Sequence, residues 1–212
     1  MSGRDEARAR ILARIREASA GREPQPHPGA LPPELEPPWA QGPEADDTTP
    51  GSRAVLDAFT RRFRAAGGEV VLLADEDRAL RWLARFCASF ETATVSPDVP
   101  MVLRPGLRGA HPADADLGVS VARGAAAQTG SVLLSSREGR SLQVLPPNHL
   151  VWIDPCDVHG TLGEALVAQV SDLPAALALH SGPSKSADIG QIMVKGVHGP
   201  GRVVAAILGV EA

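Results

Sequence analysis

A proline-rich stretch constrains this chain more than any other feature. Residues 21–50 hold nine of the nineteen prolines in a chain of 212 residues. Proline lacks a backbone N–H and disfavours both helix interiors and central strands. The sequence therefore predicts an N-terminal helix and extended arm over residues 1–50, and one globular domain over residues 51–212. We expect the arm to lie along its own domain or a neighbouring subunit.

The segment before the prolines predicts a helix over residues 2–19. Ser2 and Asp5 fit a capping pattern, and Ile11 and Ile15 mark a narrow apolar stripe. Such a stripe is typical of a solvated helix that docks weakly. The alternative is an arm that packs on a partner, which makes this helix a candidate homodimer contact.

The first part of the domain alternates helix and strand. Ser52 is a plausible N-cap for a helix that ends at Gly67-Gly68, and an apolar run at 69–74 has strand length. Asp75 caps a second expected helix, and a second strand is expected at 92–95. This order indicates an α/β fold with a parallel-type sheet and flanking helices.

The second part of the domain continues with short elements. Residues 118–136 predict strand, tight turn and strand, and residues 140–154 predict strand, Pro-Pro turn and strand. A helix is expected at 157–170 and a strand at 175–180. The latter strand runs into a stretch rich in glycine, serine and lysine.

Composition excludes several classes of function. The net charge is −4 without a basic block in the domain, so nucleic acid is not an expected partner. No apolar run approaches the roughly 20 residues that a membrane span needs, and we expect a cytoplasmic protein. The only cysteines, Cys87 and Cys156, do not form a CxxC motif and are too few for an iron–sulfur cluster. We expect no metal site or cofactor in this chain.

The stretch GPSKSADI, residues 182–189, predicts an anion site. Ser184 and Ser186 offer hydroxyls, Lys185 offers a positive charge, and Ser186 can cap a short helix from Ala187. Backbone N–H groups at a helix start favour anions. Asp188 can orient the lysine or a histidine. The alternative is a capped helix with an exposed lysine.

Histidines and a small-residue turn complete the candidate residues. His198 lies between glycines, including Gly199, and is the best candidate base because imidazole titrates near neutral pH. His149 is a secondary candidate, since a lone histidine after a turn is commonly a structural hydrogen-bonding group. The turn Thr129-Gly130-Ser131 allows close approach to a ligand, or is a tight core turn.

These motifs together resemble one protein family. GPSKSADI followed by VKGVHGP, with QTGSVLL and LPPNH earlier in the chain, resembles the LUD-domain family and, within it, the lactate utilisation (LutC) type. The resemblance covers about residues 52–210. It implies the fold of the NagB/RpiA/CoA transferase-like proteins. It also implies a part in a cytoplasmic complex that oxidises L-lactate to pyruvate, with iron–sulfur clusters in partner subunits.

The family motifs map onto individual residues of this chain. Thr129, Gly130 and Ser131 match the family's turn, but Gln128 replaces its usual glutamate and removes a carboxylate that could act as base or nucleophile. Val121 and Arg123 also depart from the usual glycine and aspartate. The residues that match in the C-terminal motif are Ser184, Ser186, Asp188, Gly196, His198 and Gly199.

Three functions are therefore weighed. The first is a non-metal subunit of a lactate-oxidising assembly, which binds a small carboxylate or supports iron–sulfur subunits. The second is a stand-alone enzyme acting on an anionic molecule such as a sugar phosphate or CoA thioester. The third is a pure interaction module. In the first two, Lys185 would hold the anion, with Thr129, Gly130 and Ser131 as the opposite wall.

Overall fold

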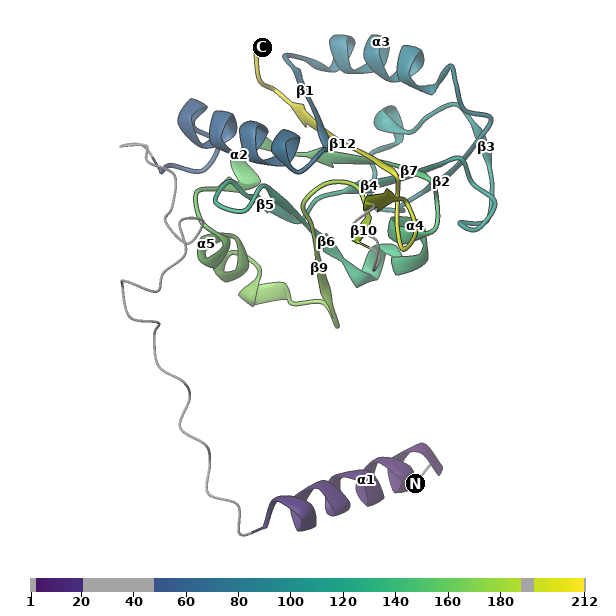
Figure 1. Cartoon of the computed structure of the whole chain (residues 1–212), viewed down its shortest axis with the longest axis vertical. Coiled ribbons are helices and arrows are strands. Elements are labelled where there is room, and N and C mark those ends of the chain that lie inside the picture. The colour runs from purple at the N-terminus through teal and green to yellow at the C-terminus, as the bar shows by residue number, and fades with distance from the viewer. Residues whose placement is uncertain (1–2, 21–47, 188–192, 212) are drawn as a thin grey trace. The chain divides into compact units, whose positions relative to one another are not determined.

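The fold is that of a computed structural model, which describes residues 3–20, 48–187 and 193–211 (Figure 1). Two units separate at Glu36 and Pro37, and each is described by itself. The first contains helix α1, Gly3–Ser19, whose Ile11 side chain is 60% exposed. The predicted helix at 2–19 is confirmed. The predicted course of the proline-rich arm lies almost wholly outside the described residues.

The first elements of the domain begin where the sequence predicts. Helix α2 spans Arg53–Ala65, and the Ser52 hydroxyl accepts a hydrogen bond from the Val55 N–H. Helix α3 spans Glu76–Cys87, and the Asp75 carboxylate accepts from the Arg78 N–H. Aspartate and serine are both favoured at the N-cap of a helix, because their side-chain oxygens accept hydrogen bonds from N–H groups of the first turn that are otherwise unpaired.

A six-stranded parallel sheet forms the centre of the domain, with strand order β1-β12-β7-β4-β2-β3. Every adjacent pair of its strands runs parallel. The predicted parallel-type sheet with flanking helices is therefore confirmed. The strands are β1 Glu69–Leu73, β2 Thr92–Val95, β3 Arg108–Gly109, β4 Leu117–Val121, β7 Asn148–Ile153 and β12 Arg202–Leu208.

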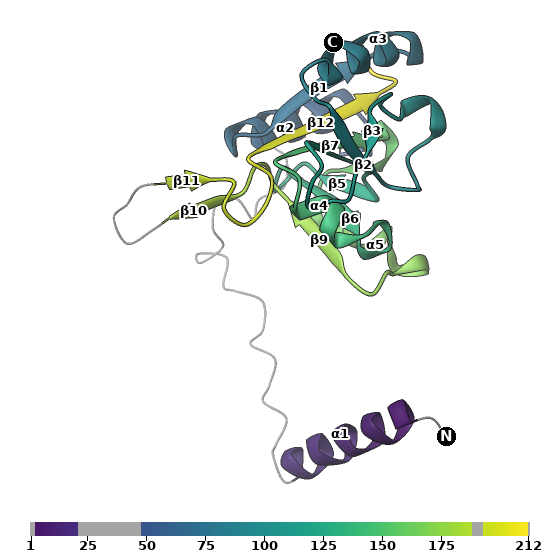
Figure 2. The ribbon, with the colours of Figure 1, turned by 90° about the vertical axis from the view of Figure 1, so that its right-hand side faces the viewer.

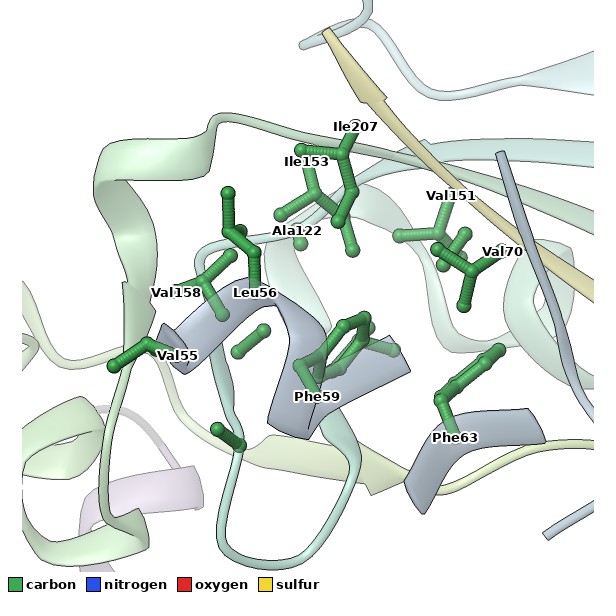
Figure 3. Packing of buried hydrophobic residues seen from close by; sticks show 14 of the residues in the cluster. Val55, Leu56, Phe59, Phe63, Val70, Ala122, Val151, Ile153, Val158 and Ile207 are labelled. Atoms are coloured by element: carbon green, nitrogen blue, oxygen red, sulfur yellow. The ribbon is translucent and has the colours of Figure 1, made fainter. Parts of the chain in front are cut away.

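The two faces of this sheet have different covers. On one face, α3 and the 3-10 helix η3, Met101–Leu103, close a core that contains Leu83, Leu103 and Trp152. On the other face, α2 inserts Phe59 and Phe63, whose stacked ring centroids lie 5.4 Å apart. Figure 3 shows these two rings beside Val70 and Val151 of the sheet.

A second sheet of four strands shares the core of α2, in the order β8-β5-β6-β9. Its strands are β5 Gly124–Ala126, β6 Ser131–Ser135, β8 Val158–His159 and β9 Leu177–His180. Helix α5, Leu162–Val167, covers its other side through Ala165. The strands were predicted in part, but their assembly into a separate sheet was not.

The predicted strand at the start of 140–154 is wrong. Residues Arg140–Val144 form helix α4, in which the consecutive residues Leu142 and Gln143 are both buried. The buried Gln143 amide donates to the Ser135 carbonyl at 2.7 Å, so the local turn satisfies a buried polar group. The second strand of that segment is β7, as predicted.

The predicted helix at 157–170 is shorter than expected. Residues Pro155–Asp157 form the 3-10 helix η5, and Val158 and His159 pair with β5. Helix α5 starts only after Thr161, because Thr161 and Glu164 form a reciprocal capping box. The short 3-10 helices η4, Ser136–Glu138, and η6, Val170–Asp172, complete this part.

The helix predicted from Ala187 is also absent. Residues Lys185–Ala187 form strand β10, which pairs antiparallel with β11, Met193–Lys195. Figure 2 shows this hairpin extending away from the two sheets. Ser186 therefore pairs with Val194 in a strand rather than capping a helix. In the described part of this segment, an anion near Ser186 therefore has no helix N-terminus to bind.

Candidate functional site

The threonine–glycine–serine corner and the start of the C-terminal motif lie side by side. Strands β6 and β9 pair antiparallel with Val132 opposite His180, which places the residues just outside this pair next to each other. The Ser131 and Ser181 hydroxyl oxygens are 2.6 Å apart, and Ser131 also donates to the Thr129 hydroxyl at 2.8 Å. Two motifs that are 50 residues apart thus share one hydrogen-bonded wall.

A hollow of about 190 Å³ opens beside this wall, and we call it the serine–histidine hollow. It is smaller than the 300–1,000 Å³ usual for drug-sized ligands. None of the described residues that line it carries a carboxylate, which leaves the hollow compatible with an anion. It is lined by Val144, Leu179, His180, Ser181, Gly182, Ser184, His198, Gly199 and Pro200.

Three predicted site residues line this hollow together. The Ser184 hydroxyl accepts a hydrogen bond from the His198 N–H at 3.3 Å, and the Ser184 N–H donates to the Pro200 carbonyl at 2.8 Å. Gly199 lies against Ser184, since a methyl group added to it would meet the Ser184 Cβ at 3.3 Å. The loop that carries His198 is therefore fixed onto the serine turn.

Two glycines, one in each of the two motifs that form the wall, allow these motifs to lie close to helix α2. Gly130 has a φ of 59°, and an added Cβ would lie 2.7 Å from the Phe63 nitrogen. Gly182 has a φ of 109°, and an added Cβ would lie 3.0 Å from the Ala66 carbonyl oxygen. Only glycine adopts such angles at little cost and leaves room for the helix backbone. Gly130 is therefore required by the packing of its corner.

Lys185 lies at the end of α2. Its ammonium donates a hydrogen bond to the Ala66 carbonyl, where the helix dipole favours a positive charge. It is not among the residues that line the hollow. Ser186 lies in the adjacent hairpin, and Asp188 lies outside the described residues. Their predicted ligand-binding roles, and that of Lys185, stay predictions.

His149 lies in the core behind the hollow. It is 1% exposed, and its Nε2 is 2.8 Å from the Ser120 hydroxyl oxygen. Burial, with a smaller contribution from the positive charge of His180, lowers the pKa of His149 to about 3. The side chain is therefore a neutral hydrogen-bonding group at physiological pH, and its Nδ1 has no partner among the described residues.

His180 is a site residue that the sequence reasoning missed. It lines the hollow, and its ring lies edge-on to His149 with 6.0 Å between the ring centroids. Burial lowers the pKa of His180, which favours the neutral imidazole that can accept a proton. Its place at the end of the strand that leads into the motif was a signal that could have identified it.

Gln128 and the two cysteines have other surroundings. The Gln128 side-chain oxygen accepts the Leu162 N–H at the start of α5, so it occupies a capping position. Cys87 is buried, and burial raises the pKa of its thiol to about 11. Cys156 is exposed, and the negative charge of Asp154 raises the pKa of its thiol, so the thiolate is disfavoured.

Two properties concern the part of the chain that the structure describes. No group of three or more histidine, cysteine, aspartate or glutamate residues there is placed to hold a metal ion. No helix there combines the length and the apolar character needed to cross a membrane.

The chain is similar to several known proteins. The family profile of the LUD domain matches residues 108–208. Lactate utilization protein C of Geobacillus kaustophilus is 29% identical, over 70% of this chain and 66% of that protein. The Bacillus pumilus protein of the same name is 37% identical, over 39% and 38%. An uncharacterized protein of Neisseria meningitidis serogroup B is 38% identical, over 44% and 42%.

A solved structure agrees in fold. The crystal structure of a DUF162 family protein from Deinococcus radiodurans superposes with a TM-score of 0.60, at 19% identity, over 74% of this chain and 99% of that one. The profile match therefore identifies a LUD domain over residues 108–208 of this chain. Among LUD-domain proteins, the chain resembles the type called lactate utilization protein C, and it spans between 38% and 66% of the three curated relatives above.

Proposed function

We propose that the chain takes part in L-lactate utilisation and holds a small carboxylate in the serine–histidine hollow. The observation that carries the proposal is the contact between Ser131 and Ser181, at 2.6 Å, beside that hollow. It brings the two motifs that resemble the family to one wall. The relatives named lactate utilization protein C support the same role.

The chemistry of the hollow supports a small anion as ligand. Hydroxyl groups and imidazoles surround about 190 Å³, and the lining residues that the structure describes include no acid that would repel a carboxylate. The Ser184 hydroxyl oxygen accepts a hydrogen bond from the backbone N–H of His198. The hydroxyl proton of Ser184 can then be donated to a ligand oxygen. Hydrogen bonds to a charged acceptor contribute more than neutral ones.

We further propose that the chain acts as a subunit without its own redox centre, beside iron–sulfur partner subunits in the cytoplasm. A cluster needs about four cysteine ligands, and this chain has two. Cys87 is buried and Cys156 is exposed, and burial and neighbouring acids raise their respective thiol pKa values. Neither cysteine is thus prepared to bind metal, and electron transfer falls to a partner.

Ligand binding is tested by calorimetric titration of the full chain with L-lactate and with L-lactamide. The two molecules match in shape, but only lactate carries a carboxylate. We expect lactate to bind and lactamide to bind at least tenfold more weakly. Ser184→Ala should weaken lactate binding about tenfold, which is the usual effect of losing one hydrogen bond to a charged group. Ser141→Ala, on the exposed side of α4, is the matched control.

The proposal fails if lactate does not bind, or if lactate and lactamide bind equally well. The role in the cell is tested by deleting the gene in its source organism and measuring growth on L-lactate as the only carbon source. We expect growth to be lost on lactate and kept on glucose. Normal growth of the deletion strain on lactate would contradict the assignment.

A further inference from the structure

A second cavity lies on a different part of the domain, at the carboxyl ends of the parallel strands. It measures about 390 Å³, and we call it the carboxyl-edge cleft. Val121 ends β4, Ile153 ends β7 and Leu208 ends β12, so three strand ends form its base. The cleft is lined by Pro100, Leu103, Val121, Trp152, Ile153, Asp154, Pro155 and Leu208.

The strand order makes this edge a favoured place for a ligand. After β2 the chain adds β3 on one side of it and then β4 on the other. The connections therefore reverse direction between β2 and β4. In open parallel sheets, ligands bind outside the carboxyl ends of the strands at such a reversal. Val121 on β4 and Pro100, which follows β2, place the cleft beside this point.

Trp152 indicates what kind of ligand the cleft would take. It is 3% exposed, it lines the cleft, and its indole Nε1 has no hydrogen-bond partner among the described residues. A buried donor without an acceptor costs free energy, so such a group calls for an explanation. A carbonyl oxygen from a ligand would supply the acceptor, because indole N–H only donates.

The charges around the cleft disfavour an anionic ligand. Asp154 belongs to its lining, and the buried Glu138 accepts a hydrogen bond from the Val121 N–H at 3.2 Å. The nearby Arg104 guanidinium is occupied by the Val99 and Pro97 carbonyls, both at 2.9 Å. A ligand here meets apolar walls, one free donor and acidic neighbours.

We propose that the carboxyl-edge cleft is a second ligand site, which takes a small neutral molecule with an apolar body and a carbonyl oxygen that accepts the Trp152 N–H. Its chemistry is opposite to that of the serine–histidine hollow, whose lining has no acidic residue in the described part of the chain. The proposal does not depend on lactate binding, and either can fail while the other holds.

The test uses benzamide, benzoate and toluene as probes on the full ¹⁵N-labelled chain. All three carry the same ring, but benzamide alone combines neutrality with a carbonyl oxygen. The indole N–H resonance of Trp152 is followed by NMR and assigned by its loss in Trp152→Phe. We expect benzamide to shift it downfield in a saturable way. Toluene lacks an acceptor and should bind about fivefold more weakly, which corresponds to one hydrogen bond. Benzoate can accept the N–H, but its charge is repelled by the acidic neighbours of the cleft, so it should also bind about fivefold more weakly.

Two variants separate binding in the cleft from binding elsewhere. Leu208→Phe narrows the cleft at its base and should weaken benzamide binding at least fivefold. Val167→Phe makes a similar change at a position that is 71% exposed on α5, and should leave binding unchanged. The proposal is overturned if benzamide does not move the Trp152 resonance, if benzoate binds equally well, or if Leu208→Phe binds like the unmodified chain.

Discussion

Glu138 is an acid placed where a charge is costly. It is 6% exposed, and burial, reinforced by the charge of Asp98, raises the pKa of its carboxyl to about 7. The Val121 N–H and the Gln143 amide donate to its two oxygens and partly offset that cost. At neutral pH the carboxyl next to the carboxyl-edge cleft is therefore partly protonated.

Glu138 makes the stability of the domain depend on pH. The folded state holds its proton up to about pH 7, whereas the unfolded chain releases it near the ordinary glutamate pKa. The stabilisation is full below that ordinary pKa and is lost as the pH rises through 7. Between pH 5 and 7.5, the free energy of unfolding of the unmodified chain should therefore fall by roughly 2 kcal/mol more than that of Glu138→Gln.

Urea unfolding across this pH range measures the difference, and carbon NMR of the glutamate carboxyl reads the titration directly. Parallel stability curves for the two proteins would contradict the prediction. So would a Glu138 carboxyl that titrates at the pKa of an exposed glutamate. The NMR measurement remains informative if the variant folds poorly, because it uses the unmodified chain.

At the scale of elements, the corner between β5 and β6 depends on helix α2. The Arg62 guanidinium donates to the Ala127 carbonyl at 3.2 Å and also to that of Gln128, and Gly130 lies against the helix backbone. The corner is therefore held by the Arg62 side chain and packed against the backbone of α2. Its glycine is needed for packing before any ligand is considered.

Gly130→Ala tests this packing. Alanine would have to adopt the strained φ of 59° at this position, and its Cβ would lie 2.7 Å from the Phe63 nitrogen. We expect the free energy of unfolding to fall by about 2 to 4 kcal/mol, from the left-handed conformation and the overlap together. Gly106→Ala is the control, because an added Cβ there has no neighbour within 4 Å. Equal stability of both variants in urea would contradict the account.

The sequence predicted correctly those elements whose ends are fixed by interactions between neighbouring residues. The caps at Ser52 and Asp75 and the apolar face of α2 gave the right helices, because these interactions lie within one or two turns. The prediction for segment 140–144 was wrong because its helix makes a contact outside the segment, from Gln143 to Ser135, which lies eight residues earlier. The expected helix at Ala187 was replaced by pairing with residues 193–195, which no local pattern shows.

At the scale of the whole molecule, the candidate site was predictable only in part. The motif residues Ser184, His198 and Gly199 do line one hollow. The position of His180 and the contact between Ser131 and Ser181 follow from the register of β6 against β9. Register between distant strands depends on the whole core, so the sequence could not supply it.

The predicted division between arm and domain can be tested by truncation. Within the described residues, the three core clusters draw on Val55 and later positions. A variant lacking residues 1–47 should therefore unfold with a free energy within about 0.5 kcal/mol of the full chain. A variant lacking residues 1–56 loses Val55 and Leu56 and should not fold cooperatively.

Sedimentation of the same proteins tests the predicted homodimer contact of the arm. We expect the full chain to sediment as a dimer and the variant lacking residues 1–47 as a monomer. Equal masses for the two proteins would end that prediction. If the variant lacking residues 1–47 were much less stable than the full chain, the domain would have to begin before residue 48.

The carboxyl end of α2 contacts both loops that form the wall beside the serine–histidine hollow. Arg62 donates to the corner before Ser131, while the residue that ends the helix, Ala66, accepts from Lys185 and lies against Gly182. Because one helix end supports both loops, a substitution that shifts this end of α2 would displace the two motifs together.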